Sequence, residues 1–161
     1  MNNADLEKEV KRLVHSNRYE KGLVCAVDIL IQLNYLIKKD YEDWRFGRIK
    51  YLEKCCNFNL SKLTLINKLI RKYSIELGLK ASWTGYSKYG KGENRRLRFS
   101  KSGDKNIEDK YATHYIDTKR INELKREKKA SMQQRLIKHR LAAGATQAYS
   151  FIAETLPHII K

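Results

Sequence analysis

Proline is almost absent from this chain, with Pro157 the single one among 161 residues, and glycine occurs only eight times. This composition argues against long disordered linkers and favours one domain, or a compact domain with a helical arm. Charged residues make up 32% of the chain, and runs typical of strands are few. We therefore expect a mainly α protein with a small β-hairpin, in the α+β class.

The sequence also lacks a long hydrophobic run. Its most apolar stretch, residues 23–37, contains Asp28, Gln32 and Asn34, whereas a membrane span needs roughly 20 mostly apolar residues. Residues 1–12 are too charged for the apolar core of a signal peptide. We expect no membrane partner, and a buried helix over residues 23–37.

Cysteine is scarce, and Cys25, Cys55 and Cys56 lack the spacing of a zinc site or a disulfide framework. The four histidines are too scattered to supply zinc ligands. The glycines at residues 90–92 lack the lysine-serine ending of a phosphate-binding loop. We therefore expect no metal and no cofactor, and a reducing cytoplasm as the location.

Negative charge is in short supply, because 18 acidic residues face 34 lysines and arginines, for a net charge of +16. Between Leu60 and Lys101 eleven cations accompany only Glu76 and Glu93. A basic patch of this density can neutralise the phosphates of a nucleic acid. Nucleic acid is thus the expected partner, and DNA is favoured over RNA.

The apolar pattern predicts helices before and within this basic region. A first helix runs from Asn3 or Asp5 to near His15, a second over residues 19–39 and a third over residues 44–56. After a short turn at residues 57–59, an amphipathic helix over residues 60–77 ends at Gly78. Residues 43–78 thus have the pattern of a helix-turn-helix.

The amphipathic helix over residues 60–77 has a polar and basic face, which we expect to point toward solvent. Such side chains can donate to phosphates or reach base edges in a major groove, although an ordinary solvated face has a partly similar composition. The candidate nucleic-acid contacts on this helix are Ser61, Thr64, Asn67, Lys68, Arg71 and Lys72.

Residues 81–100 carry a hairpin pattern with a glycine-rich tip at residues 90–94. Alternation predicts Leu97 and Phe99 in the core, with Arg96 and Arg98 in water. A helix-turn-helix followed by such a hairpin resembles a winged helix, whose wing would contact the DNA backbone. The candidate contacts in this segment are Lys88, Lys91, Arg95, Arg96, Arg98 and Lys101.

Aromatic residues are interleaved with the hairpin cations. Exposed aromatic side chains would stack on unpaired bases. Large aromatic side chains are more often buried, and we expect Trp83, Tyr86 and Phe99 in the core of the hairpin. Duplex DNA is therefore favoured over a single strand.

Residues 104–117 support a weaker, catalytic alternative. Asp104, Glu108 and Lys110 lie near His114, and metal-dependent nucleases use paired carboxylates and a lysine to hold Mg²⁺ and activate water. Two carboxylates four residues apart are common on helix surfaces, so a turn and a solvated helix are favoured here.

Residues 118–161 form a C-terminal extension to a single globular domain over residues 1–117. Its first part, to residue 140, is predicted as a basic helix, and an apolar segment beyond Gly144 can dock on the core or on a second subunit. The leading hypothesis is non-catalytic DNA binding through the basic helix and the hairpin wing. The alternatives are an adaptor or inhibitor that binds an acidic protein, and a small metal-dependent nuclease or RNase toxin.

Overall fold

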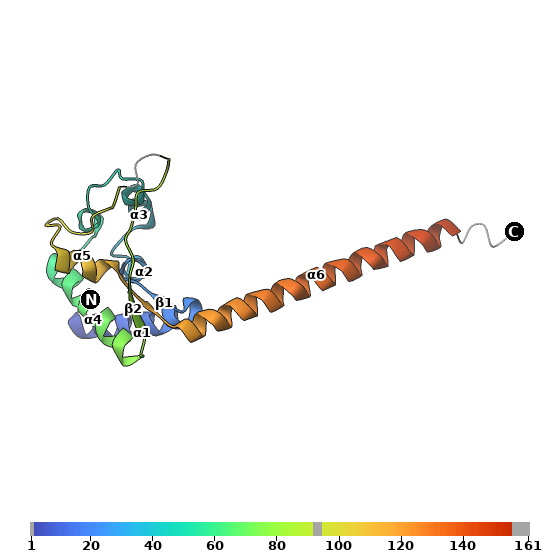
Figure 1. The fold of residues 1–161 in the computed structure, drawn as a ribbon, viewed down its shortest axis with the longest axis horizontal. Coiled ribbons are helices and arrows are strands. Elements are labelled where there is room, and N and C mark those ends of the chain that lie inside the picture. The colour runs from blue at the N-terminus through green and yellow to red at the C-terminus, as the bar shows by residue number, and fades with distance from the viewer. Residues whose placement is uncertain (1, 92–94, 156–161) are drawn as a thin grey trace. The chain divides into compact units, whose positions relative to one another are not determined.

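The computed structural model describes residues 2–91 and 95–155, with the side chains described as far as residue 143. The described chain is mainly helical with one small antiparallel sheet (Figure 1), as the composition predicts. It divides into two units between Ile121 and Asn122. None of the helices in the described part is long and apolar enough to span a membrane.

Ten elements follow one another along the chain. They are α1 (Asn3–Lys21), β1 (Leu23–Val24), α2 (Ala26–Gln32), α3 (Lys38–Arg45), the 3-10 helix η1 (Leu52–Cys55), α4 (Leu60–Glu76), β2 (Lys80–Trp83), α5 (Lys105–Ala112), β3 (Thr113–Ile116) and α6 (Thr118–Thr155).

Helix α1 is capped by polar and glycine residues at its two ends. The side chain of Asn2 accepts a hydrogen bond from the backbone N–H of Asp5 at 2.8 Å, and Gly22 ends the helix in the left-handed conformation with φ 66°. The expectation that this helix ends near His15 was wrong, since it continues to Lys21.

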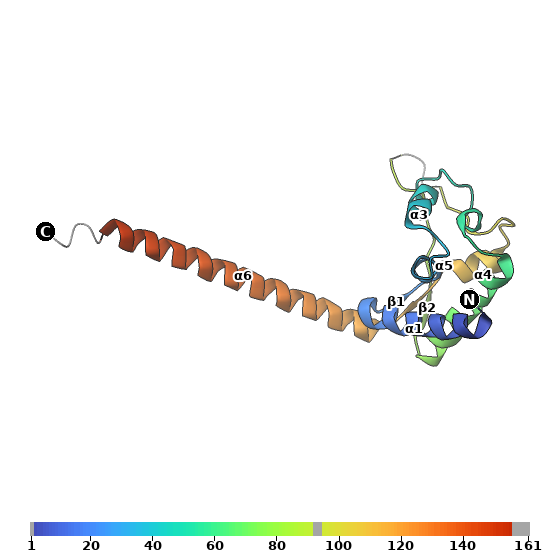
Figure 2. The same cartoon turned by 180° about the vertical axis from the view of Figure 1, so that it is seen from behind.

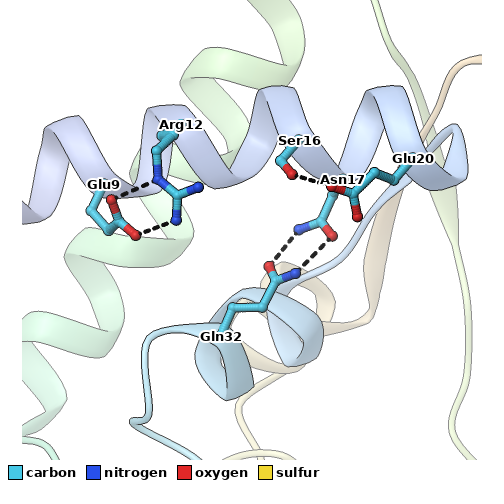
Figure 3. A network of polar contacts seen from close by, with 6 residues as sticks. All are labelled: Glu9, Arg12, Ser16, Asn17, Glu20 and Gln32. Carbon is cyan, nitrogen blue, oxygen red and sulfur yellow. Dashed lines mark hydrogen bonds and ion pairs between the residues drawn. The ribbon is translucent and has the colours of Figure 1, made fainter.

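Ser16 and Asn17 lie between the two helices expected to end near His15 and to begin at residue 19, but both are part of α1 and their side chains form hydrogen bonds (Figure 3). The hydroxyl of Ser16 donates to the Glu20 carboxylate at 2.7 Å. The fully buried Asn17 exchanges two amide hydrogen bonds with Gln32 of α2, at 2.8 and 3.2 Å. These bonds satisfy a buried amide and hold α2 against α1.

The continuous helix expected over residues 19–39 is replaced by β1, α2 and a turn. Gly22 redirects the chain, so that Leu23 and Val24 pair with β3 instead of continuing the helix. The turn after α2 places Asn34 at φ 59°, a conformation that asparagine tolerates. The segment nevertheless supplies much of the core, as its apolar character predicts.

The helix expected over residues 44–56 is also interrupted. Helix α3 ends at Arg45, and the amides of Leu52 and Glu53 donate to the carbonyls of Arg98 and Phe99, at 3.1 and 2.9 Å. The indole N–H of Trp44 donates to the same Arg98 carbonyl at 2.8 Å. These long-range bonds hold the 3-10 helix η1 and its neighbours between α3 and α4. The two helices are therefore joined by residues 46–59 and not by the tight turn expected at residues 57–59.

The sheet has the order β1-β3-β2, with β3 in the centre and both pairings antiparallel. Strand β2 pairs with β3, so residues 80–83 are not an arm of the expected hairpin. The chain does double back further along, where the N–H of Lys88 donates to the Arg95 carbonyl at 2.9 Å and that of Leu97 donates to the Tyr86 carbonyl at 2.8 Å. Residues 86–88 and 95–97 are therefore the paired arms of a narrow hairpin.

The core beneath this hairpin contains Trp44, Tyr86, Phe99 and Tyr111, whose ring centroids lie 5.1–5.6 Å apart where they touch. Leu97 and Phe99 are buried while Arg96 and Arg98 are exposed, so the alternation predicted for this segment is confirmed. Trp83 is 52% exposed, and the expectation that it belongs to the core was wrong.

Helix α6 continues without a break past Gly144, where the sequence suggested a separate apolar segment. Every side chain over residues 125–143 is exposed. They include the large apolar side chains of Met132, Leu136, Ile137 and Leu141. Leu156, Ile159 and Ile160, which belong to the predicted apolar segment, lie outside the described residues.

Candidate functional site

Helix α4 presents most of its predicted polar face to solvent. The helix begins at the Asn59 cap, whose side chain accepts from the N–H of Lys62 at 3.0 Å. Ser61, Thr64, Lys68, Arg71 and Lys72 are exposed. Asn67 is an exception, because it is only 9% exposed, and the expectation that it faces solvent was wrong.

Asn67 is covered because α4 faces α5 across a groove, which we call the α4–α5 groove. It consists of two cavities of about 510 and 380 Å³, and both are lined by Thr64, Asn67 and Lys110. Lys68 and Arg71 line the second cavity as well. A helix that the sequence did not link to α4 thus adds a cation to the α4 face.

The cations on α4 and in the α4–α5 groove differ in how they are engaged. Lys72 is paired with Glu7 at 2.9 Å. Lys68, Arg71 and Lys110 form no ion pair with another described residue. These three charges are therefore available to an anionic ligand, and solvent screening keeps the cost of leaving them unpaired low.

The arginines of the hairpin are held close to the protein. The Arg98 guanidinium donates to the carbonyls of Ser100 and Lys101, and the Arg96 guanidinium lies 4.5 Å from the Trp83 ring centroid. Lys88, Lys91, Arg95 and Lys101 are exposed. Residues 92–94 of the predicted tip lie outside the described residues.

The hairpin arm that carries Tyr89 packs on the end of α3, away from α4 (Figures 1 and 2). The N–H of Tyr89 donates to the Arg45 carbonyl at 2.6 Å, and the Tyr89 and Phe46 rings meet edge to face at 5.7 Å. The Arg45 guanidinium lies 3.8 Å from the Tyr89 ring centroid. The predicted cations of α4 thus lie apart from those around Tyr89, whereas Lys101 lines a cavity of the α4–α5 groove together with Thr64 and Asn67.

The candidate catalytic carboxylates are engaged in the local fold. Asp104 caps α5 by accepting from the N–H groups of Asn106 and Ile107 at 2.9 and 3.2 Å. The Glu108 carboxylate is buried and accepts three hydrogen bonds from residues 99–100. Residues 2–91 and 95–143 contain no group of three or more His, Cys, Asp or Glu side chains that could hold a metal ion.

His114 and the cysteines have environments typical of packed side chains. The Nε2 atom of His114 lies 2.9 Å from the Tyr86 hydroxyl, and burial lowers the pKa of this imidazole. Burial raises the pKa of Cys25 and Cys55 to about 11 and that of Cys56 to about 12. The thiols are therefore neutral near pH 7, where a neutral thiol is a weak nucleophile.

Sequence reasoning missed two features near the candidate site. Lys105 of α5 and Trp83 of β2 line a third cavity of about 590 Å³, together with Arg96 and Arg98 from the hairpin segment. For Trp83, the only signal in the sequence was the alternative that exposed aromatic side chains stack on unpaired bases. For Lys105 the sequence contained no signal. No family model, curated protein or solved structure matches the chain.

Proposed function

We propose that this protein binds nucleic acid without cleaving it, with duplex DNA as the first ligand to test. The observation that carries this proposal is the α4–α5 groove, where Lys68, Arg71 and Lys110 line one cavity without described ion-pair partners. Cations held along a groove neutralise successive phosphates and release their counterions, which drives binding. The net charge of +16 adds long-range attraction for a polyanion.

The expected docking mode is related to that of a winged helix. Helix α4 would present Thr64, Lys68 and Arg71 to a groove, and the hairpin would present Lys88 and Arg95 to the backbone. The exposure of all five side chains supports this mode. Because the hairpin arm that carries Tyr89 packs on the end of α3, the α4 and hairpin cations would contact separate stretches of backbone.

The test is fluorescence anisotropy of labelled duplex DNA, single-stranded DNA and structured RNA across a salt series, with magnesium present and the products run on a gel afterwards. We expect binding that weakens steeply with salt and leaves the polymer intact. The triple variant Lys68→Gln, Arg71→Gln, Lys110→Gln should bind more weakly, with a slope of log K against log salt that is smaller by about 0.9 for each lost phosphate contact on duplex DNA.

A charge-matched control separates these contacts from a general loss of charge. Lys8, Arg12 and Lys21 are exposed cations of α1, and the triple glutamine variant of these residues should retain nearly the full salt slope. Equal slopes for the two triple variants would show that the α4–α5 groove is not the binding surface. Cleavage of the polymer would contradict the non-catalytic proposal.

A second candidate, an adaptor for an acidic protein, is favoured by α6 alone. Over residues 125–143 all side chains are exposed, and Met132, Leu136, Ile137 and Leu141 lie among seven lysines and arginines. An acidic helix could cover such a surface, and a second copy of the chain is a further expected occupant. If heparin competes with the nucleic acid for the protein and a specific duplex does not, the adaptor candidate is favoured. Light scattering measures whether a second copy of the chain forms a dimer.

The proposed location for either function is a reducing cytoplasm. The three cysteines are free thiols in the described structure, and such thiols persist in reducing compartments.

A further inference from the structure

The two tryptophans of this chain have opposite environments. Trp44 is fully buried, whereas Trp83 at the end of β2 is 52% exposed. Large exposed aromatic side chains gain little from folding and are frequent at binding surfaces. The exposure of Trp83 therefore needs a physical explanation other than core packing.

The Trp83 ring is held in one orientation although it is exposed. Its Nε1–H donates to the Asp109 carboxylate of α5 at 2.9 Å, and the Arg96 guanidinium lies 4.5 Å from the ring centroid. Gly85 leaves room for the ring, because a Cβ atom at that position would lie only 2.8 Å from the Cη2 atom of Trp83. Three contacts thus fix an aromatic surface before any ligand arrives, which lowers the entropy lost on binding.

The space beside this ring is sized and charged for a nucleotide. The adjoining cavity has a volume of about 590 Å³, within the 300–1,000 Å³ range of small-ligand pockets. Its charged lining consists of three cations, Arg96, Arg98 and Lys105, and two carboxylates, Glu108 and Asp109. Arg98 is bonded to backbone carbonyls and Asp109 holds the indole. Arg96 is held over the Trp83 ring. Lys105 forms no ion pair with another described residue, so it can reach a phosphate next to a bound base.

We propose that Trp83 is a stacking platform for an unpaired nucleobase, with Lys105 on the adjacent phosphate. This inference rests on the proposed nucleic-acid binding and specifies that the ligand contains a single-stranded part. Bases within a duplex are stacked on each other and cannot cover the ring, whereas every unpaired base has a π-face to offer. A duplex with a single-stranded overhang satisfies both the α4–α5 groove and the platform.

The test compares a blunt duplex with the same duplex carrying a short single-stranded overhang. Anisotropy of the labelled DNA reports binding, and tryptophan emission reports contact with the platform, since fully buried Trp44 provides a constant background. We expect the overhang to bind about 5- to 100-fold more tightly than the blunt duplex. Only the overhang should quench the emission.

Variants then assign both effects to Trp83. Trp83→Ala should lose the preference for the overhang and keep its affinity for the blunt duplex, while Trp83→Phe retains an aromatic face and should keep part of the preference without the quenching. The matched control is Tyr19→Ala, because Tyr19 is also exposed and has the Arg120 guanidinium 4.6 Å from its ring centroid. This control should behave as the wild type does.

The possible results separate this inference from the function on which it rests. If the protein binds both duplexes equally and its emission does not change, the platform is refuted and nucleic-acid binding stands. The platform is likewise refuted if Trp83→Ala still prefers the overhang. If no nucleic acid binds even at low salt, both the platform and the proposed function are refuted. The emission of the wild type decides the question even if a variant fails to fold.

Discussion

Replacing Glu108 with alanine should destabilise the fold by about 3–5 kcal/mol. The Glu108 carboxylate on α5 is only 9% exposed and accepts bonds from the backbone N–H groups of Phe99 and Ser100, at 2.9 and 2.7 Å, and from the Ser100 hydroxyl at 2.6 Å. Alanine leaves three buried donors without this acceptor. A hydrogen bond to a charged group contributes about 1.5–3 kcal/mol, and water entering the vacated space recovers part of the loss.

The magnitude is large against the 5–15 kcal/mol that a domain usually has in total, so urea denaturation followed by circular dichroism will resolve it. Glu108→Gln keeps the shape and one acceptor oxygen but turns an amide N–H₂ toward a donor, so it should fall between the wild type and alanine. Glu76→Ala is the control, because Glu76 is exposed on α4, and it should change the free energy of unfolding by less than about 0.5 kcal/mol. A loss below about 1 kcal/mol for Glu108→Ala would refute the assigned role of this carboxylate.

Two further predictions concern stability. Burial lowers the pKa of His114 in the folded protein below its usual 6.5. As the pH drops, His114 is therefore protonated in the unfolded chain before it is protonated in the folded one. The free energy of unfolding should consequently fall from about pH 7 downward, until the pH has passed the lowered folded-state pKa. His114→Gln should flatten this part of the curve measured by urea denaturation, and the exposed His15→Gln should not. Gly22→Ala should cost about 2–4 kcal/mol, because φ is +66° and the new Cβ would lie 2.6 Å from the Ile121 side chain. Gly78 has a similar φ of +67°, but a Cβ atom added there would have no other atom within 4 Å. Gly78→Ala should therefore cost only about 1 kcal/mol of unfolding free energy in a thermal or urea melt. Equal costs for the two glycine variants would rule out the clash with Ile121.

Local signals explain the parts of the fold that the sequence predicted well. Helix α4 was expected over residues 60–77 and spans Leu60–Glu76, because an asparagine cap, a helical apolar pattern and Gly78 all act within a few residues of the helix. The alternation that buries Leu97 and Phe99 is equally local. In both segments the prediction was correct because residues close in sequence determine the conformation.

Long-range contacts explain the parts that were predicted wrongly. The helix expected over residues 44–56 is interrupted because Leu52, Glu53 and Trp44 donate hydrogen bonds to the carbonyls of residues 98–99. The sequence of residues 44–56 alone does not reveal these distant acceptors. The break expected at Asn17 is absent because Gln32 satisfies its amide. Contacts between distant segments also explain the errors at the candidate site, because α5 covers Asn67 and brings Lys110 to the α4 face.

The central place of β3 has a consequence for how the chain reaches its native state. Leu23 of β1 pairs with Ile116 of β3. Residues that are far apart in the sequence must therefore come together before β1 and β3 can pair. Closing so long a loop comes late and slowly compared with forming α1 or α4. On the ribosome, a nascent chain that stops short of Thr113 leaves β1 and β2 without their shared neighbour, and these open strand edges are exposed to pairing with other chains until β3 is synthesised.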